Sequence, residues 1–472
     1  MSGSSTTTLT VLTLNCWGLR FISKKINQRI EAIADSLSRS DYEIVCLQEV
    51  WIYGNYELIR NKIKKRFPYT RFYHSGVLGG GLAIFSRYSI VETNFYPYRL
   101  NGRPIQVNHG DWYVGKGVAS AVVDHPVAGL IEIFNTHTHA GYGSKATDIY
   151  LGHRVSQGWD ASNLMKISAS RGRNVIAAGD FNTEQDTLVY KLLTQNGQMT
   201  DAWQSQHSST PGSDSTSSIT QPQGGLSGTD PNSAILQKGV TSNSPINTWT
   251  KRSRKQSTRD LGQRIDYIFY RKTSRFWCSG SRVVFVEKIP ELNCSYSDHF
   301  GVEATFTLVG RDKNSVIPLS VWEQAPYTLR ELDSRTLKNI VDLFKKDLIN
   351  SQTTSRLQLL LFWISLLLVI CLITLEILIA LGTISAQAWI SIIIIVVIGP
   401  LAVSGSIMGL IGFLFGNTEQ NVLNQLIEEV KTFNEGKKIL ESRESKASSG
   451  GFSDGNQRSS TEINVEAERN RL

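Results

Sequence analysis

The chain has few cysteines, and their positions exclude two kinds of site. The five cysteines among 472 residues are scattered, odd in number and without the spacing of a metal site. A disulfide framework is therefore not expected, and a reduced, cytosol-facing domain is favoured. The first ten residues are polar and lack the charged and then apolar pattern of a secretory leader. No internal repeat is visible either.

One glycine-rich segment lacks the residue that would make it a nucleotide-binding loop. Residues 110–116 fit the pattern G-x-x-x-x-G-K, but Gly117 follows where a P-loop has Ser or Thr. That hydroxyl holds Mg²⁺, and a P-loop opens a helix, whereas residues 117–123 have the pattern of a strand. ATP binding is therefore not expected.

Positive charge is in excess, with a formal net charge of +8. Two basic clusters, at residues 60–66 and 251–259, contribute to it. Such clusters can be a solvated face, or they can bind anionic lipid headgroups or nucleic acid. The apolar segments described next favour lipid over nucleic acid as the partner.

Two long apolar runs stand near the C-terminus, at residues 357–381 and 388–415. Roughly 20 apolar residues cross a hydrocarbon core of ~30 Å, so each run can span a membrane. The connector, residues 382–387, is short and uncharged, which predicts a helical hairpin rather than a buried pair of core helices. Within the second run, Gly405 and Gly409 would let helices approach closely, either inside the hairpin or between two chains.

Basic residues flank both outer ends of the hairpin, and none lies in its connector. Cytoplasmic flanks carry an excess of Lys and Arg, so we expect the N-terminal domain and the C-terminal tail on the cytosolic side. The flanking residues are Lys345, Lys346, Arg356, Lys431, Lys437 and Lys438.

The remaining chain divides by its hydrophobic pattern. Residues 8–310 alternate strand-length apolar runs with helical patterns such as residues 26–37, which predicts one α/β domain. Residues 208–244 are rich in Ser, Thr, Gly and Pro and are expected to be a flexible insertion.

Two further helices and a tail complete the expected organisation. Residues 311–356 are interpreted as a linker followed by an amphipathic helix, and residues 416–441 as a second amphipathic helix. Residues 442–472 are polar and Ser-rich, and a disordered tail is expected there.

Five short motifs place polar side chains at the ends of apolar runs, where α/β folds bind ligands. Hydrolysis of a phosphodiester requires charge neutralisation, an activated water and a stabilised leaving oxygen. Asn, Glu, Asp and His can supply these functions together. The motifs are Leu14-Asn15-Cys16-Trp17, Leu47-Gln48-Glu49, Asn135-Thr136-His137, Gly179-Asp180-Phe181-Asn182 and Ser297-Asp298-His299.

Glu49 is the first candidate for a metal ligand, because Mg²⁺ prefers carboxylate oxygens. Asn15, at another strand end, could help to hold the same ion. Asp180 and Asn182 are two residues apart, so in an extended segment they would face the same way, which suits orienting a water and holding a phosphoryl oxygen. Each residue, taken alone, could equally be an ion pair or a turn residue.

His299 is the candidate general base, because histidine titrates near neutrality. Asp266 could orient the imidazole and stabilise its cation, and Asp298 lies beside it in sequence. His137 could donate to phosphoryl oxygens. With His139 it would share one face of a strand, a spacing that also permits a zinc site.

In this order over about 300 residues, the motifs resemble the DNase I-like metal-dependent phosphoesterase superfamily. The resemblance implies a four-layer α/β sandwich and dependence on Mg²⁺, for which Mn²⁺ could substitute. It implies that Glu49 and Asn15 belong to the metal site and that Asp180 and Asn182 orient water and phosphate. His137 becomes a transition-state donor and His299 the base, with Asp266 as its partner. The resemblance adds Asp298 to the site as a further acidic residue.

Other segments resemble the eukaryotic neutral sphingomyelinases, and within them the fungal inositol phosphosphingolipid phospholipases C. This resemblance implies that Asp111 and Lys116 control activity as a regulatory pair and that anionic phospholipids activate. The segments are residues 72–76, 81–86, 101–104, 110–116, 136–140 and 153–159.

The sequence thus predicts a membrane-anchored phospholipase C that releases ceramide from inositol phosphosphingolipids. A neutral sphingomyelinase that releases phosphocholine is the alternative, because the sequence does not fix the headgroup. A nuclease of the superfamily and a non-catalytic membrane scaffold are more remote alternatives. The endoplasmic reticulum is the expected compartment, with the mitochondrial outer membrane as the alternative, and the hairpin could pair two chains.

Overall fold

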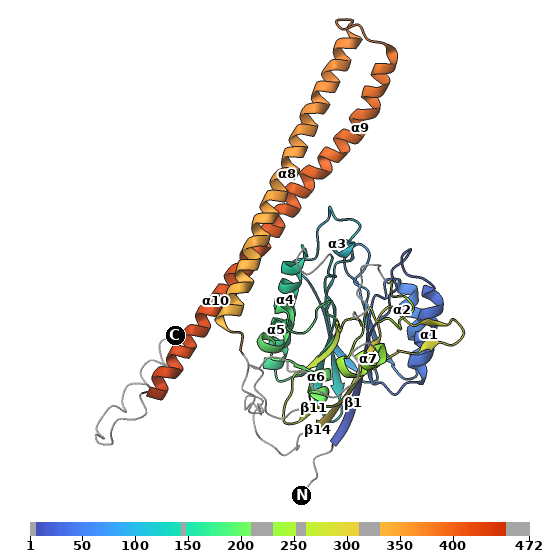
Figure 1. The fold of residues 1–472 in the computed structure, drawn as a ribbon, viewed down its shortest axis with the longest axis vertical. Coiled ribbons are helices and arrows are strands. Elements are labelled where there is room, and N and C mark those ends of the chain that lie inside the picture. Colours follow the sequence, from blue (N-terminus) through green and yellow to red (C-terminus); the bar gives the residue numbers. More distant parts are fainter. Residues whose placement is uncertain (1–5, 143–147, 209–229, 252–260, 311–330, 450–472) are drawn as a thin grey trace.

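The computed structural model describes residues 6–142, 148–208, 230–251, 261–310 and 331–449. In the described residues, two six-stranded sheets pack face to face, with helices over their outer faces. A long helical hairpin leaves one flank of this sandwich and extends beyond it (Figure 1).

The first sheet has the strand order β11-β14-β1-β2-β4-β3. Its central strands β1 and β2 are parallel, and Asn15 pairs with Gln48 at their carboxyl ends. The chain therefore leaves both strands at the same edge, which brings the first two motifs together. The strands are β1 (Thr6–Asn15), β2 (Ile44–Gln48), β3 (Tyr69–Tyr73), β4 (Leu82–Ser86), β11 (Phe276–Val284) and β14 (Gly301–Val309).

The second sheet has the order β5-β6-β7-β8-β10-β9. Strands β7 and β8 are parallel, with His137 opposite Asp180, and β10 runs antiparallel to β8 with Asp266 also opposite Asp180. His137, Asp180 and Asp266 thus meet at one edge of this sheet. The strands are β5 (Ile90–Pro97), β6 (Gly117–His125), β7 (Gly129–His137), β8 (Asn174–Asp180), β9 (Thr200–Asp201) and β10 (Asp266–Tyr270).

Alternating side chains of each strand build three apolar layers. Leu9 and Val11 of β1 point toward the second sheet, whereas Leu12 and Leu14 pack under α1 (Ile26–Arg39) and α2 (Tyr53–Ile63). The outer face of the second sheet packs against α4 (Leu151–Ser170), α5 (Leu188–Lys191) and the π-helix η1 (Leu192–Asn196). The predicted DNase I-like four-layer sandwich is confirmed.

Short elements complete the domain at its edges. They are α3 (Asp111–Val114), α6 (Ala202–His207), α7 (Pro231–Lys238), β12 (Lys288–Ile289) and β13 (Cys294–Ser295).

The expected flexible insertion is only partly within the described structure, and there it differs from expectation. Residues 209–229 lie outside the described residues, as do residues 252–260 of the second basic cluster. Residues 230–238 instead form a capped helix: Asp230 accepts hydrogen bonds from the backbone of Asn232 and Ser233 at its start. Ile235 and Val240 then pack against Phe300, so burial of a few apolar side chains orders a segment that its composition suggested was flexible.

The hairpin is built from α8 (Ser334–Ala380), α9 (Ala388–Leu410), the π-helix η2 (Ile411–Phe415) and α10 (Gly416–Ser449). Two helices are long and apolar enough to cross a membrane. A Cβ at Gly405 would collide with Ser365, and one at Gly409 with Phe362, so these glycines close the hairpin on itself. The separate amphipathic helices expected at its base are instead continuous with the spans.

The base of the hairpin packs firmly on the domain, which the sequence analysis did not anticipate. Leu337, Ile340 and Phe344 of α8 and Leu426 and Val430 of α10 are buried in the core cluster that contains Trp159 of α4. The described part of the expected linker, residues 331–356, and the expected second helix, residues 416–441, therefore both contribute side chains to the core of the folded domain. Residues 311–330 and the tail from 450 onward lie outside the described residues.

Candidate active site

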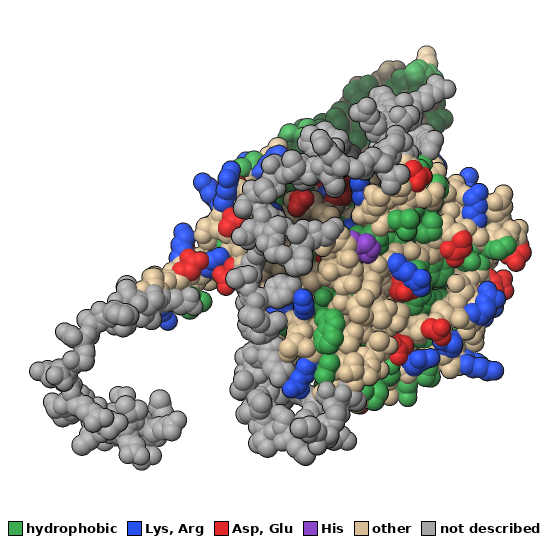
Figure 2. Space-filling view, turned by 60° about the horizontal axis from the view of Figure 1, so that its bottom comes forward, with side chains coloured by type: hydrophobic (Ala, Val, Ile, Leu, Met, Phe, Trp, Pro, Cys, Tyr) green, Lys and Arg blue, Asp and Glu red, His purple; other side chains and the backbone are tan. Residues whose placement is uncertain are grey.

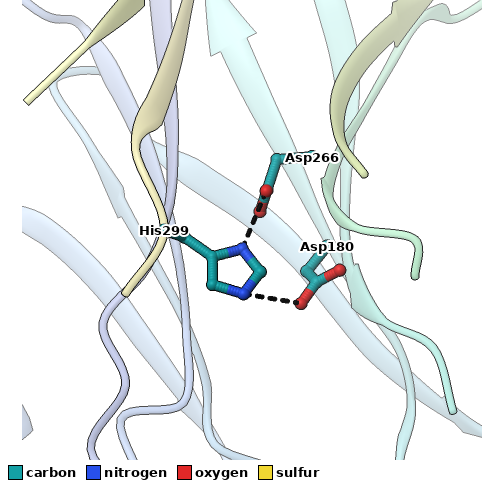
Figure 3. Close-up of side chains that lie close together, drawn as sticks. All are labelled: Asp180, Asp266 and His299. Carbon is teal, nitrogen blue, oxygen red and sulfur yellow. Dashed lines mark hydrogen bonds and ion pairs between the residues drawn. The ribbon is translucent and has the colours of Figure 1, made fainter. Parts of the chain in front are cut away.

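The polar residues at the strand ends of both sheets converge on one buried site. Asp180 and Asp266 come from the second sheet, and His299 comes from the segment that enters β14 of the first (Figure 3). His299 Nδ1 lies 2.8 Å from Asp266 Oδ2, and His299 Nε2 lies 3.9 Å from Asp180 Oδ2. The imidazole is thus held at one nitrogen and faces a carboxylate with the other.

The charges of this group favour a bound proton or cation. Burial disfavours the charged imidazole, but Asp266 and Asp180 outweigh it and raise the pKa of His299 well above its usual value. Burial, together with Asp266, raises the pKa of the Asp180 carboxyl. Two carboxylates at close range in a buried site are stabilised by positive charge between them.

Asn15 joins Glu49 to Asp180 across the two sheets. Its Nδ2 atom donates to Glu49 Oε1 and to Asp180 Oδ2, both at 3.0 Å. Trp51 Nε1 approaches the other oxygen of Glu49 at 3.4 Å. The sequence predicted Glu49 and Asn15 to lie at one site, and the structure brings them together with Asp180.

Asp298 is half-buried beside His299. Burial raises the pKa of Asp298 to about 6, while the charge of His299 opposes this and that of Glu49 adds to it. Its own hydrogen-bond partner is the hydroxyl of Ser297, at 3.3 Å.

The oxygen-rich donor set suits a hard divalent cation. Asp180, Asp266 and His299 place one ligand atom each within 4.8 Å of one another and could hold a metal ion. Asp266 Oδ1 is buried and makes no hydrogen bond to the described residues. Carboxylate and amide oxygens are the ligands that Mg²⁺ prefers, so the residues present fit such an ion.

Asn182 does not lie in an extended segment, which corrects the geometric argument made from its spacing. Strand β8 ends at Asp180, and Asn182 has a φ of 43° in the left-handed region. Its backbone N–H donates to Asp180 Oδ1 at 2.9 Å, and its side chain donates to the carbonyl of Thr138 at 3.1 Å. A tight turn therefore, rather than strand alternation, sets Asn182 beside Asp180.

Lys116 connects His137 to Asp111. Its Nζ atom lies 3.0 Å from His137 Nε2, 2.9 Å from the carbonyl of Thr138 and 2.6 Å from Asp111 Oδ1. Burial and the charge of Lys116 hold the pKa of His137 well below its usual value, so its neutral ring accepts from the ammonium. The predicted pair of Asp111 and Lys116 is thus formed in this structure and reaches the site through His137.

His139 lies on the far side of this pair. Its Nε2 atom is 3.7 Å from Asp111 Oδ2, and its ring packs against Tyr150 with centroids 4.1 Å apart and a tilt of 32°. His137 Nε2 faces the Lys116 ammonium and His139 Nε2 faces Asp111, so the two rings point to different partners.

Arg29 was not identified from the sequence, and the motif residues Gln48 and Asn135 were given no role there. The buried guanidinium of Arg29 donates to the carbonyls of Cys16, Trp17 and Tyr296 at 2.7–2.9 Å, and so ties two motif segments together. Arg29 falls within the apolar face of α1, and a charged residue on such a face was the available signal. Gln48 Nε2 donates to Asn135 Oδ1 at 2.8 Å and links the sheets below the site.

Comparison with known proteins agrees with this geometry. The sequence pattern of the Endonuclease/Exonuclease/phosphatase family matches residues 12–299. The chain is 36% identical to the inositol phosphosphingolipids phospholipase C of Schizosaccharomyces pombe, over 91% of this chain and 95% of that one. It is 32% identical to the protein of that name from Saccharomyces cerevisiae, over 89% and 88%.

A human relative is similar over a shorter stretch. Sphingomyelin phosphodiesterase 2 of Homo sapiens is 33% identical over 41% of this chain and 46% of its own length. The fold, the convergent site and these similarities agree: the chain is a member of the endonuclease/exonuclease/phosphatase family.

Proposed function

We propose that this protein is a Mg²⁺-dependent phospholipase C that hydrolyses inositol phosphosphingolipids to ceramide and an inositol phosphate headgroup. The observation that carries the proposal is the contact of His299 with Asp266 opposite Asp180. It stands in a chain similar almost end to end to two proteins named for this reaction.

In this proposal His299 takes a proton from the attacking water. Its Nδ1 atom is held by Asp266, so Nε2 is the nitrogen that faces the site. A positioned base contributes about 10²–10⁴ in rate. Asp180 and Asn182, which share a hydrogen bond, orient the water and the phosphate, and Asp298 adds negative charge beside the base.

Glu49 and Asn15 would hold the Mg²⁺ ion, with Asp180 on the opposite side of Asn15. We favour this set because Glu49 and Asp180 are two carboxylates that approach one side chain, whereas the hydrogen bond of Asp266 to His299 suits proton transfer. The ion would neutralise charge on the phosphate, and Mn²⁺ offers similar ligand preferences.

The neutral ring of His137 and the ammonium of Lys116 line one side of the site. Lys116 Nζ is 3.0 Å from His137 Nε2, so His137 can donate to a phosphoryl oxygen in the transition state only if this contact is rearranged. The Asp111–Lys116 pair then acts as a regulatory element, and anionic phospholipids favour the rearranged state. A ligand shifts such an equilibrium only through its different affinity for the two states.

The hairpin would keep the domain at the surface of the membrane that contains the substrate. Basic residues at its outer ends favour a cytosolic domain, at the endoplasmic reticulum or the mitochondrial outer membrane. Since Gly405 and Gly409 already close the hairpin on itself, pairing of two chains would need another face.

The decisive experiment compares substrates with the purified full-length protein. We expect release of inositol phosphate from inositol phosphosphingolipid, stimulated by anionic phospholipid and abolished by chelation. Faster turnover of sphingomyelin would favour the sphingomyelinase alternative, and nicking of plasmid DNA the nuclease. Absence of turnover on all three would favour a non-catalytic scaffold.

A further inference from the structure

Four apolar side chains are exposed on the loops around α3. The exposed fractions are 78% for Val77, 57% for Leu78, 67% for Val107 and 39% for Trp112. We call these four residues the apolar rim. Water contact with such side chains costs free energy in proportion to their exposed area, so a cluster of them calls for a partner.

Backbone and side-chain contacts hold the rim together as one surface. The N–H groups of Val77 and Leu78 both donate to the carbonyl of Tyr113, at 2.9 and 3.1 Å. The hydroxyl of Tyr113 donates to the carbonyl of Pro104 at 2.8 Å, which ties in the loop that carries Val107. The three segments, distant in sequence, are therefore fixed around α3.

The rim lies against the root of the membrane hairpin. The ring of Trp112 packs edge-on to Phe415, with centroids 6.5 Å apart. Figure 1 shows α3 at the end of the domain toward which the hairpin rises. The rim therefore lies at the level at which the second span ends, at Phe415.

The length of that span places Phe415 near the bilayer surface. Residues 388–415 form about 42 Å of helix at 1.5 Å per residue, longer than a hydrocarbon core of ~30 Å. The end of the span then lies among the lipid headgroups, where tryptophan is enriched. The face that Figure 2 brings forward, at the other end of the domain, carries basic and acidic side chains interspersed among apolar ones.

We propose that the apolar rim inserts into the headgroup region of the membrane that holds the hairpin. Rim residues Val107 and Trp112 both lie in the segment that leads to Lys116. Insertion of this segment would therefore open the site toward the lipid surface. The inference rests on the proposed membrane function and specifies which part of the domain touches the lipid.

The test measures lipid contact without using catalysis. Four of the five cysteines are buried and Cys371 is exposed, so Leu78→Cys in a Cys371→Ser background offers one labelling site. The full-length variant carries a fluorophore and is reconstituted into vesicles containing nitroxide-bearing phospholipid. A matched probe at Val91→Cys, 57% exposed near the Ile90–Val123 pairing at the opposite end of the sheet, reports the background.

We expect several-fold stronger quenching at position 78 than at position 91. Equal quenching at the two positions would overturn the proposal. If quenching at position 78 instead grew with protein density and occurred without nitroxide, a second copy of the chain would cover the rim. That result would also overturn the proposal.

A kinetic experiment separates this inference from the proposed function. Val77→Ser/Leu78→Ser should raise the apparent KM on vesicles several-fold and leave the rate on detergent-dispersed substrate unchanged, whereas Val91→Ser should alter neither. An unchanged KM on vesicles would contradict rim insertion. Lipid quenching in a protein that turns over no sphingolipid would leave the rim intact and reject the proposed function.

Discussion

His299 and Asp266 share a hydrogen bond of 2.8 Å although they come from different sheets. Strand β10 begins at Asp266, and His299 lies two residues before β14. The relation between these residues therefore depends on how the sheets pack, and it sets which imidazole nitrogen faces the site.

Substitution of the base should abolish turnover while the fold persists. His299→Ala is expected to lower kcat by about 10²–10⁴, as measured by product release from vesicles. Asp266→Asn should show a smaller loss because the ring keeps a partner that no longer stabilises its cation. A His299→Ala variant with more than roughly a tenth of the wild-type rate would reject the assignment.

The metal assignment predicts a charge-specific effect at Glu49. Glu49→Gln retains shape but removes the charge, so activity should fall and more Mg²⁺ should be needed for half-maximal rate. EDTA should abolish wild-type activity and added Mg²⁺ restore it. The surface variant Glu57→Gln, on α2 and paired with Arg60, serves as the control. Full activity in chelator would contradict the assignment.

The Asp111–Lys116 pair predicts a loss of lipid control. Lys116→Ala should remove most of the stimulation by anionic phospholipid, measured as the ratio of rates with and without it. ATP should neither bind nor stimulate. Because a buried charge left alone can cost ~3–5 kcal/mol, the double variant Asp111→Asn/Lys116→Met controls for misfolding, and it too should lack stimulation. Undiminished stimulation in either folded variant would refute the regulatory role.

Asp347, at the base of the hairpin, should make the stability of the protein depend on pH. Burial raises the pKa of this carboxyl to about 6, with Arg103 opposing the shift. A Cβ at Gly152 of α4 would collide with it. The folded state thus binds its proton more tightly than the unfolded chain, whose pKa is about 3.9. The resulting loss in the free energy of unfolding is absent below pH ~4. It grows as the pH rises and levels off once the pH is well above ~6.

Asp347→Asn should therefore stabilise the protein by roughly 1–3 kcal/mol at pH 7.5 and have little effect near pH 4. Thermal unfolding of the full chain in detergent at both values measures this difference. The exposed neighbour Asp342→Asn should show no such pH dependence. An equal shift at both values would mean that Asp347 does not titrate as described.

Because the base of the hairpin packs on the domain, deletion of the hairpin together with the C-terminal helix should destabilise the domain. Deleting residues 356–472 removes the buried Leu426, Ile427 and Val430 of α10, so that chain should unfold at lower temperature and aggregate. Ser355 and Gly416 adjoin, so a chain lacking only residues 357–415, joined by a short Gly-Ser linker, should keep both docked segments. This chain should act on dispersed substrate and lose activity on bilayers. If the chain lacking residues 356–472 unfolded at the same Tm as the full-length protein, this account would be contradicted.

Sequence patterns predicted the parts of the site that local chemistry determines. The apolar spacing of residues 26–37 corresponds to α1 (Ile26–Arg39), and the motif residues lie at strand ends as expected. The five motifs meet because parallel pairs such as β1 and β2 end at one edge. Convergence within each sheet needed only the order of strands and polar residues, whereas the meeting of the two sheets depends on their packing.

Features that depend on tertiary packing were not predictable in the same way. The segment around Ser242 looked flexible by composition, yet Ser242 forms a bridge with His299 and is held by the packing of Val240. Burial of a few side chains outweighed the composition. Likewise Glu429 on α10 bonds to Trp159 and Arg99, contacts between residues some 270 and 330 positions apart that no local pattern encodes.

The unbroken helix α8, which runs 47 residues from the docked base to the tip of the hairpin, acts as a fixed gauge between catalysis and anchorage. A flexible tether would let the domain search a volume of solution, whereas a rigid helix would restrict it to one height and one orientation relative to the hairpin. The enzyme then meets substrate by lateral diffusion of lipids in two dimensions. Each residue added to such a helix would lift the domain by about 1.5 Å and swing it by about a third of a turn, so length and orientation cannot vary independently.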